Sequence, residues 1–411
     1  MDYLIFDGAM GSMLQGYGLK PGEPSETQNT ANSEAVRHIH NLYAEAGADV
    51  LTANTFGAFE LKYAGSSDSI IEAAMENLRL GAERAGRSVR AALDIGPTGR
   101  LLAPLGDLTF DEAYRNFKRA ADCGAAFGAD YILIETMTDI YEMKAAVLAA
   151  KTTGLPVIAT MTFDMHGRSL TGTTPLGMVL LLEALQVDAI GMNCGYGPDL
   201  YEKLLPELLE AASLPVLVQP NAGLPEMVNG VAKYSLAPDE FAQSMTRMAA
   251  AGAFMLGGCC GTTPAHIAAI AKMKVCTSAN GSTAVFPEKF NRTLKITGIS
   301  SPSKTLLLDK PMEAYTIAKC SGTDIDTRID EAMELADDAD IIEIHIDTPA
   351  DVQKVQEMVR VPLSLKADSP EVLLEAVRLY NGCPLITGVP QDEGLINRLR
   401  AFGGVIKAEM V

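Results

Sequence analysis

The sequence predicts a (β/α)8 TIM barrel, in which eight parallel strands form a closed ring inside a ring of helices, followed by a smaller α/β domain. Short apolar segments alternate with segments of helical period along the first two thirds of the chain. Most of these short segments are apolar on both faces, which is typical of parallel strands covered by helices. About eight such units within about 275 residues match a barrel, whose usual size is about 250 residues.

Composition sets limits on function. The chain has 411 residues, 48% of them hydrophobic and 21% charged, which is enough for one large and one smaller domain. A net charge of −19 argues against nucleic-acid binding, which needs clustered Lys and Arg. The N-terminus lacks a basic leader, and no segment has the roughly 18 continuous apolar residues of a membrane span. The seven cysteines suit reduced thiols. We therefore expect a cytoplasmic protein that binds neither nucleic acid nor membrane.

The eight units of the barrel follow one another in order, and we place the barrel at residues 1–275. The strands are expected at 5–8, 49–54, 89–94, 130–135, 157–163, 189–194, 216–220 and 254–259. The helices after them are expected at 34–47, 70–86, 111–128, 139–151, 176–185, 198–212, 238–251 and 264–273.

Polar residues gather where these strands end. In a TIM barrel the functional groups sit at the carboxyl ends of the strands. The predicted strands end, in order, at Asp7, Asn54, Asp94, Glu135, Thr162, Asn193 with Cys194, Gln219 with Asn221, and Cys259 with Cys260. The opposite ends are mostly short Gly-Ala-Asp or Leu-Pro connectors. The sequence therefore predicts one chemically active rim.

A second region follows a polar, turn-rich linker at residues 276–292. From 293 to 411 the β/α alternation resumes, with strands expected at 340–346, 362–366, 385–389 and 405–407, and helices at 324–336, 371–380 and 395–402. These units make up about half a barrel. An open sheet of this kind has edges that must be covered, by the first domain or by a second subunit in a homodimer.

Three cysteines are candidate metal ligands. Cys194 ends the sixth predicted strand, and Cys259 and Cys260 end the eighth, so all three thiols can meet at one mouth of a closed barrel. Three thiolates form a zinc site of the catalytic type, with the fourth position open for a substrate. An isolated cysteine is more often a small buried apolar residue. We expect that role for the remaining cysteines, Cys123, Cys276, Cys320 and Cys383.

These motifs resemble the homocysteine S-methyltransferase family. The segment 257–264 with His266 and Ile267 is very similar to the homocysteine-binding module of the cobalamin-dependent methionine synthases. Further matches lie at 7–14, 54–56, 134–137, 193–195 and 220–225, so the resemblance covers roughly the first 275 residues. It implies that Cys194, Cys259 and Cys260 bind zinc, and it supports a substrate contact for Glu135 and for the Asp7-Gly8 turn.

The resulting hypothesis is that zinc activates homocysteine. The reactive form of a thiol is its thiolate, and an unperturbed thiol has a pKa of about 8.5, so coordination to zinc would supply the nucleophile at neutral pH. Glu135 would hold the substrate ammonium, and the turn containing Gly8, Gly11 and Ser12 would offer amides to its carboxylate. The other predicted contacts have structural alternatives: Asp7 and Asn54 could cap turns, and Asn193 could order the Cys194 loop.

The sequence leaves the methyl donor open. Methionine synthases of this family carry folate- and cobalamin-binding modules after the homocysteine barrel, and we expect this chain to be too short for them. Residues from about 294 weakly resemble the first half of a pterin-binding barrel. We therefore expect methylcobalamin, a methylcorrinoid, to come from a separate corrinoid protein. The alternatives are a small donor such as S-methylmethionine or a betaine-like compound, a barrel that binds phosphate at Gly257-Gly258, and a binding protein with a purely structural zinc.

Overall fold

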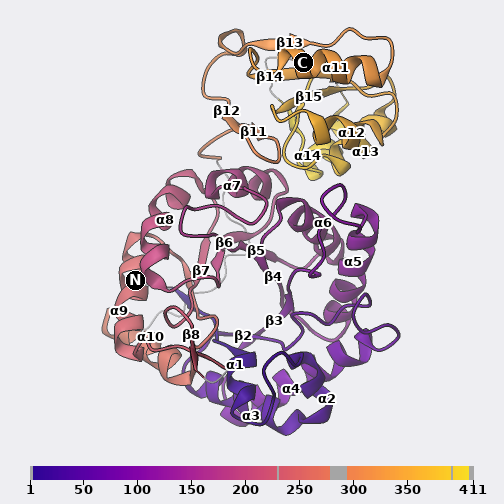
Figure 1. Cartoon of the computed structure of the whole chain (residues 1–411). Helices are drawn as coiled ribbons and strands as arrows, with labels where there is room; N and C mark the ends of the chain where they lie inside the picture. The colour runs from indigo at the N-terminus through magenta and orange to yellow at the C-terminus, as the bar shows by residue number, and fades with distance from the viewer. Residues whose placement is uncertain (1–2, 229–230, 278–293, 390–391, 407–411) are drawn as a thin grey trace.

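A computed structural model describes residues 3–228, 231–277, 294–389 and 392–406 (Figure 1). Its larger sheet has eight parallel strands in the order β1-β10-β7-β6-β5-β4-β3-β2, and a bridge between Phe6 and Val50 joins the two ends. This ring confirms the predicted barrel. Its strands are β1 (Leu4–Ile5), β2 (Val50–Thr52), β3 (Arg90–Ile95), β4 (Tyr131–Met137), β5 (Val157–Met161), β6 (Ala189–Asn193), β7 (Val216–Gln219) and β10 (Met255–Leu256).

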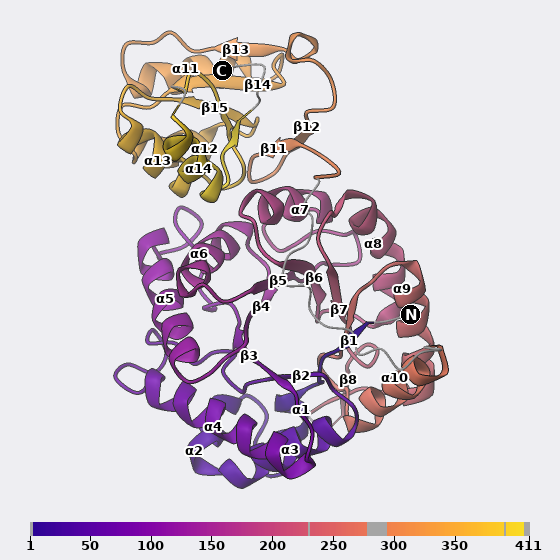
Figure 2. The ribbon, with the colours of Figure 1, turned by 180° about the vertical axis from the view of Figure 1, so that it is seen from behind.

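A ring of helices surrounds these strands, as the views from the front and from behind show (Figures 1 and 2). The helices are α3 (Ser33–Glu45), α4 (Ser67–Ala85), α5 (Phe110–Ala126), α6 (Ile140–Ala150), α7 (Pro175–Ala184), α8 (Pro198–Ala211), α9 (Pro238–Ala251) and α10 (Pro264–Thr277). Several begin at side-chain caps: Thr109 and Glu112 form a capping box on α5, and Asp139 caps α6. Large apolar side chains such as Phe6, Leu133 and Met255 fill the inside of the ring.

Short elements in two of the loops were not predicted from the sequence. The β1–α3 loop contains α1 (Met10–Gln15), the 3-10 turn η1 (Ser25–Thr27) and α2 (Gln28–Ala31). The β7–α9 loop contains an antiparallel hairpin of β8 (Glu226–Val228) and β9 (Val231–Lys233). Both loops follow the carboxyl ends of barrel strands, so both lie at the rim where the functional groups are expected.

The smaller domain is an open parallel sheet with the strand order β13-β14-β15-β16-β17. Its elements are β13 (Ile317–Lys319), α11 (Ile325–Leu335), β14 (Ile341–His345), α12 (Asp351–Met358), β15 (Leu363–Lys366), α13 (Pro370–Leu379), β16 (Leu385–Ile386), α14 (Glu393–Ala401) and β17 (Val405–Ile406). A hairpin of β11 (Gly298–Ser300) and β12 (Thr305–Leu307) and the turn η3 (Met312–Ala314) precede it. Most of the predicted linker, residues 278–292, lies outside the described residues.

The smaller domain packs against the barrel on the side of α6 and α7 (Figure 1). All eleven residues of α6 are buried. Lys144 on this helix is fully buried, and its Nζ donates hydrogen bonds to the carbonyl oxygens of Val377 at 2.8 Å, Tyr380 at 2.7 Å and Gly382 at 3.2 Å. The hydroxyl of Tyr141 donates to the carbonyl of Leu379 at 2.7 Å. Two side chains of a barrel helix thus satisfy carbonyl groups at the end of α13.

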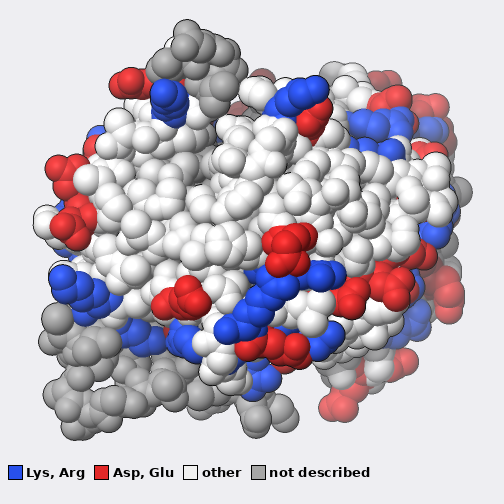
Figure 3. Space-filling model, turned by 90° about the horizontal axis from the view of Figure 1, so that it is seen from below, with Lys and Arg blue, Asp and Glu red and all other residues white. Residues whose placement is uncertain are grey.

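The outer surface carries charges of both signs. Figure 3 looks from below onto the side where α2, α3 and α4 lie, and it shows Lys and Arg interspersed with Asp and Glu around broad uncharged areas. Among the residues that the structure describes, no helix is both long and apolar enough to cross a membrane.

Candidate metal and substrate site

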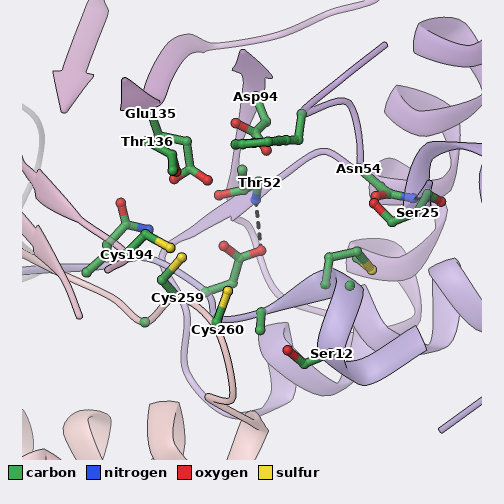
Figure 4. A pocket seen from close by; sticks show the side chains of 18 of the residues that line it. Ser12, Ser25, Thr52, Asn54, Asp94, Glu135, Thr136, Cys194, Cys259 and Cys260 are labelled. Carbon is green, nitrogen blue, oxygen red and sulfur yellow. Dashed lines mark hydrogen bonds between the residues drawn. The ribbon is translucent and has the colours of Figure 1, made fainter. Parts of the chain in front are cut away.

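A cavity of about 240 Å³ opens at the carboxyl ends of the barrel strands. Figure 4 shows the side chains of Asp94 and Glu135 on one side of it and those of Cys194, Cys259 and Cys260 on another. The residues that line it come from seven strand ends and from the β1–α3 and β2–α4 loops: Asp7, Gly8, Ala9, Met10, Gly11, Ser12, Ser25, Thr52, Ala53, Asn54, Phe56, Asp94, Glu135, Thr136, Cys194, Gln219, Gly258, Cys259 and Cys260. The predicted rim is therefore where the cavity lies.

The thiols of Cys194, Cys259 and Cys260 converge, with their sulfur atoms all within 4.8 Å of one another. Cys194 has a φ of +62° and Gly195 a φ of +69°, so the chain makes a left-handed turn directly after β6. The amide of Cys194 donates to the carbonyl of Gln219, and the amide of Cys259 donates to the carbonyl of Pro220, each at 3.0 Å. These bonds fasten Cys194 and Cys259 to the end of β7, and the carbonyl of Cys260 accepts a hydrogen bond from the amide of Ala222 at 3.0 Å. A set of three thiols at this spacing, with a cavity beside it, fits a tetrahedral zinc ion with one open position.

Charge is shared within this group of thiols. Hydrogen bonds from Cys194 and Cys259 lower the pKa of Cys260 to about 3. Hydrogen bonding to Cys194 and Cys260 holds the pKa of Cys259 well above its usual range. A divalent ion bound between the three sulfur atoms would take all three as thiolates.

The β8–β9 hairpin brings a further residue to the thiols. The hydroxyl of Tyr234, directly after β9, hydrogen-bonds the sulfur of Cys260. Gly261 has a φ of +78°, and a Cβ atom at this glycine would overlap the ring of Tyr234. The segment is anchored by Leu236, whose amide donates to the carbonyl of Ala222 and whose carbonyl lies 3.0 Å from Nε2 of His266. The chain around Gly261 can therefore approach the hairpin only because this residue lacks a side chain.

Three carboxyl groups face the same space: those of Asp7 and Asp94 are buried, and that of Glu135 is half-buried. Burial raises the pKa of Asp7 to about 7, against the effect of a 2.8 Å hydrogen bond from the Thr52 amide to its Oδ2. Burial, followed by the charges of Asp7 and Cys260, raises the pKa of Glu135 to about 8. Burial and the nearby charge of Glu135 raise the pKa of Asp94 well above its usual range. None of the described residues that line the cavity is Lys, Arg or His. The cavity therefore favours cationic contents.

The turn after β1 forms another wall. Gly8, Gly11 and Ser12 all line the cavity. Their contact with a substrate carboxylate stays a prediction. Gly8 has no room for a side chain, because a Cβ would lie 2.6 Å from Oγ1 of Thr262. The hydroxyl oxygen of Ser12 accepts a hydrogen bond from the amide of Gly261 at 3.2 Å, which ties this wall to the cysteine segment.

The two predicted asparagines have different positions. Asn54 lines the cavity, but its amide nitrogen is engaged with the carbonyl of Ser25 at 2.8 Å and with Oδ1 of Asn29 at 3.0 Å. Asn193 is fully buried and does not reach the cavity wall. Its side chain accepts from the amide of Thr136 at 2.7 Å and from the hydroxyl of Thr160 at 2.8 Å, and it donates to the hydroxyl of Thr136 at 2.7 Å. Asn193 thus joins the end of β6 to the end of β4, beside Glu135.

Sequence reasoning missed several residues that line the cavity or contact its cysteines. Asp94 stands at a predicted strand end, so the rule that selected Asp7 and Glu135 also pointed to it. Thr52, Thr136 and Gln219 belong to the same strand ends. Ser25 and Tyr234 belong to the loops after β1 and β7. These loops have no periodic pattern from which the position of a side chain at the rim could be predicted.

Exposed apolar side chains gather in the loops around the mouth. The barrel residues with large exposed apolar side chains are Tyr17, Leu61, Leu101, Leu105, Phe127, Met165, Leu170, Leu224 and Met227. All of them except Phe127 belong to loops that follow barrel strands, and so to the rim that carries the cavity. The large exposed apolar side chains of the barrel are thus concentrated in the loops on the side of the cavity.

Comparison with known proteins agrees with this site. The family model described as homocysteine S-methyltransferase matches residues 4–274. The chain belongs to this family. The matched residues span the whole barrel with its cysteine and carboxyl groups, so the resemblance seen in the motifs is confirmed.

Two proteins that are similar to this chain are methionine synthases. That of Mycobacterium tuberculosis (strain ATCC 25618 / H37Rv) is 34% identical over 296 residues, 66% of this chain and 25% of the relative. That of Mycobacterium leprae (strain TN) is 33% identical over 295 residues, 65% of this chain and 24% of the relative. The chain spans about a quarter of the length of these relatives.

The barrel is also similar to a solved structure. The crystal structure of the homocysteine methyltransferase MmuM from Escherichia coli, in its metallated form, matches with a TM-score of 0.57 and 25% sequence identity. The match covers 66% of this chain and 96% of that chain. The common part is therefore a barrel that makes up nearly all of the E. coli protein.

Proposed function

We propose that this chain is a zinc-dependent S-methyltransferase that converts homocysteine to methionine. The observation that carries the proposal is one cavity in which three converging thiols face the carboxyl groups of Asp7, Asp94 and Glu135, without a basic residue among the described lining residues. Homocysteine suits this environment because it brings a thiol for a metal and an ammonium for a carboxylate. Zinc, when bound by Cys194, Cys259 and Cys260, would lower the pKa of the substrate thiol and so supply a thiolate at neutral pH.

The residues of the chain would orient the substrate. Glu135, at the end of β4, would bind the ammonium group and set the direction of the amino acid in the cavity. The wall formed by Gly8, Gly11 and Ser12 would contact the carboxylate. Asp7 adds negative charge beside the thiols, Asn54 holds the η1 loop against the rim, and Asn193 positions Thr136 next to Glu135. The sulfur of the substrate would then lie toward the mouth, where the methyl donor arrives.

For the donor, we favour a methylcorrinoid carried by a separate protein. The exposed apolar side chains in the rim loops, including Leu105, Met165, Leu170 and Met227, support this choice because they offer a contact surface larger than a small donor would use. S-methylmethionine or a betaine-like compound is the alternative. A small donor would have to enter the same cavity of about 240 Å³ beside homocysteine.

Phosphate binding at Gly257-Gly258 is disfavoured by charge. The nearby cavity is lined by acidic side chains, which repel a phosphate. In addition, a Cβ at Gly257 would lie 2.8 Å from Cβ of Phe6, so close packing accounts for this glycine without a ligand. A purely structural zinc is the other alternative, and the cavity beside the thiols argues for a catalytic one.

The proposal is tested by metal content and by product formation. We expect the parent protein to bind close to one zinc ion per chain and to form methionine from homocysteine with a methylcorrinoid protein. Cys259→Ser should lose both properties. Cys123→Ser, which changes a thiol on helix α5 outside the cavity, should keep both properties. The assay is repeated with S-methylmethionine and with betaine as donors.

The outcomes separate the candidates. A parent that binds no zinc and methylates no homocysteine with any donor contradicts the proposal. Zinc binding without turnover favours the structural metal, whereas turnover with a small donor alone keeps the methyltransferase but replaces the corrinoid partner.

A further inference from the structure

We propose that Tyr234 is a positioning residue for the metal centre: its hydroxyl holds the sulfur of Cys260 and offsets part of the negative charge that the thiolates concentrate there. The inference rests on the proposed function, because it takes Cys194, Cys259 and Cys260 as ligands of zinc. It goes further in giving the segment after β9, which contributes no ligand, a part in holding the metal.

The proposed centre has an excess of negative charge. Three thiolates outweigh one divalent ion by a single charge, and the thiolate of the substrate would add another. The cavity beside the thiols adds the carboxyl groups of Asp7, Asp94 and Glu135, and its described lining residues include no Lys, Arg or His. Hydrogen-bond donors are therefore needed to stabilise the sulfur atoms.

The backbone amides beside the cysteine pair are engaged with oxygen atoms. Those of Gly258, Cys259 and Thr262 each donate to a carbonyl oxygen, at 3.0 or 3.1 Å. The amide of Gly261 donates to the hydroxyl of Ser12 at 3.2 Å. These four donors of the tight turn after β10 are therefore not available to the sulfur atoms.

The hydroxyl of Tyr234 is a donor from outside this turn. It hydrogen-bonds the sulfur of Cys260, to which the thiols of Cys194 and Cys259 also bond. A bond from a hydroxyl to a thiolate is charge-assisted and about twice as strong as one between neutral groups. The ring packs directly on Gly261, where a Cβ atom would lie 2.1 Å from Cγ of the tyrosine. The ring is thus held against the residue that follows Cys260.

His266 connects the segment of the tyrosine to that of the cysteine. Its Nδ1 accepts from the amide of Thr263 at 3.2 Å, so its Nε2 carries the proton and donates to the carbonyl of Leu236 at 3.0 Å. Thr263 lies three residues after Cys260, and Leu236 lies two residues after Tyr234. The hydroxyl is therefore held near the sulfur by the fold as well as by its own bond, as is usual for residues that orient metal ligands.

The test removes the hydroxyl alone. Tyr234→Phe keeps the ring that packs on Gly261, and Tyr17→Phe is the matched control, because Tyr17 is a 41% exposed tyrosine of the β1–α3 loop. The zinc affinity of the full chain is measured by competition with a chromophoric chelator for the parent and both variants. Each chain is also loaded with Co²⁺, whose thiolate charge-transfer band reports on the electron density of the sulfur ligands. Chemical denaturation compares the metal-free and zinc-loaded forms.

We expect Tyr234→Phe to bind zinc about 10-fold more weakly than the parent, the lower end of the range for residues that support metal ligands, because water can partly replace a half-exposed hydroxyl. Its cobalt band should move to lower energy, since a thiolate without the hydrogen bond gives up an electron more readily. The denaturation midpoint of the metal-free form should change less than that of the zinc-loaded form. Tyr17→Phe should match the parent in every measurement.

Other results overturn the inference. If Tyr234→Phe keeps the zinc affinity and the cobalt band of a parent that methylates homocysteine, the hydroxyl has no role at the centre and the proposed function stands. If zinc affinity falls while the cobalt band stays in place and the metal-free form loses equal stability, Tyr234 only packs against the turn. If the parent itself binds no zinc, the proposed function fails, and the inference fails with it.

Discussion

The ammonium nitrogen of Lys144 lies 2.7 Å from the carbonyl oxygen of Tyr380, so a barrel helix caps the last turn of a helix in the other domain. This contact repeats at Val377 and Gly382, and Tyr141 adds a fourth carbonyl, that of Leu379. Nearby, Arg378 reaches from α13 to Asp111 at 2.5 Å and lies over the ring of Phe110. The two domains are therefore joined by directional polar contacts in addition to apolar packing.

Replacing Lys144 should weaken the whole chain. Lys144→Met fills a similar volume but leaves three buried carbonyl groups without a donor, so we expect the free energy of unfolding at neutral pH to fall by about 2 kcal/mol. Chemical denaturation measures this change. Lys118→Met, which removes an exposed ion pair with Asp122, should cost less than about 0.5 kcal/mol. Equal effects of the two substitutions would show that the interdomain bonds contribute little.

The same lysine predicts a pH dependence of stability. Burial lowers the pKa of Lys144 to about 7, compared with about 10.4 in an unfolded chain. Between these values the unfolded chain holds a proton that the folded chain has released, so stability should rise with pH. From about pH 7.5 to about pH 9.5 the parent should gain about 2.5 kcal/mol relative to Lys144→Met. A constant difference would mean that the three carbonyl acceptors keep the ammonium charged.

Asn193 should matter for both stability and substrate binding. Asn193→Ala removes three hydrogen bonds that connect β6 with β4 and β5, so we expect a loss of about 2–3 kcal/mol. Homocysteine affinity should fall as well, because Thr136 follows Glu135 directly. Asn116→Ala is the control: it removes a single bond, to the amide of Leu61, outside the cavity. A destabilised Asn193→Ala that binds homocysteine as tightly as the parent would exclude a positioning role.

Substitution of Gly261 should lower the stability of the protein for two reasons that can be tested separately. Gly261→Ala places a side chain at a φ of +78° and against the ring of Tyr234, whereas Gly65→Ala meets a similar φ of +76° in open space. The control should therefore lose about 1 kcal/mol from backbone strain alone. Gly261→Ala should lose more, and it should also release zinc more readily to a chelator because Cys260 is displaced. Similar stability and zinc retention in both variants would remove Tyr234 from the explanation.

Most strands and helices of the barrel could be predicted from the sequence because their apolar residues recur at regular spacing. The strand-end rule also placed Asp7, Glu135 and the three cysteines at the cavity, and it pointed to Asp94 without distinguishing it from a turn residue. Tyr234 could not be predicted, since its position depends on how a hairpin folds over the rim. Strand β13 has three residues, two of them apolar, which is too short for a pattern. The hydrogen bonds of Asn193 could not be predicted either, because they depend on β4, β5 and β6 lying side by side.

Because α6 is buried on every side, it limits which C-terminal domains can be joined to this barrel. This helix has no solvent face, so each of its eleven positions serves either the barrel or the smaller domain. A chimera that joins this barrel to a different C-terminal domain would leave Tyr141 and Lys144 facing carbonyl groups that are no longer there. Exchange of the smaller domain should therefore succeed only when the sequence of α6 is exchanged with it, although the two segments are separated by more than a hundred residues of chain.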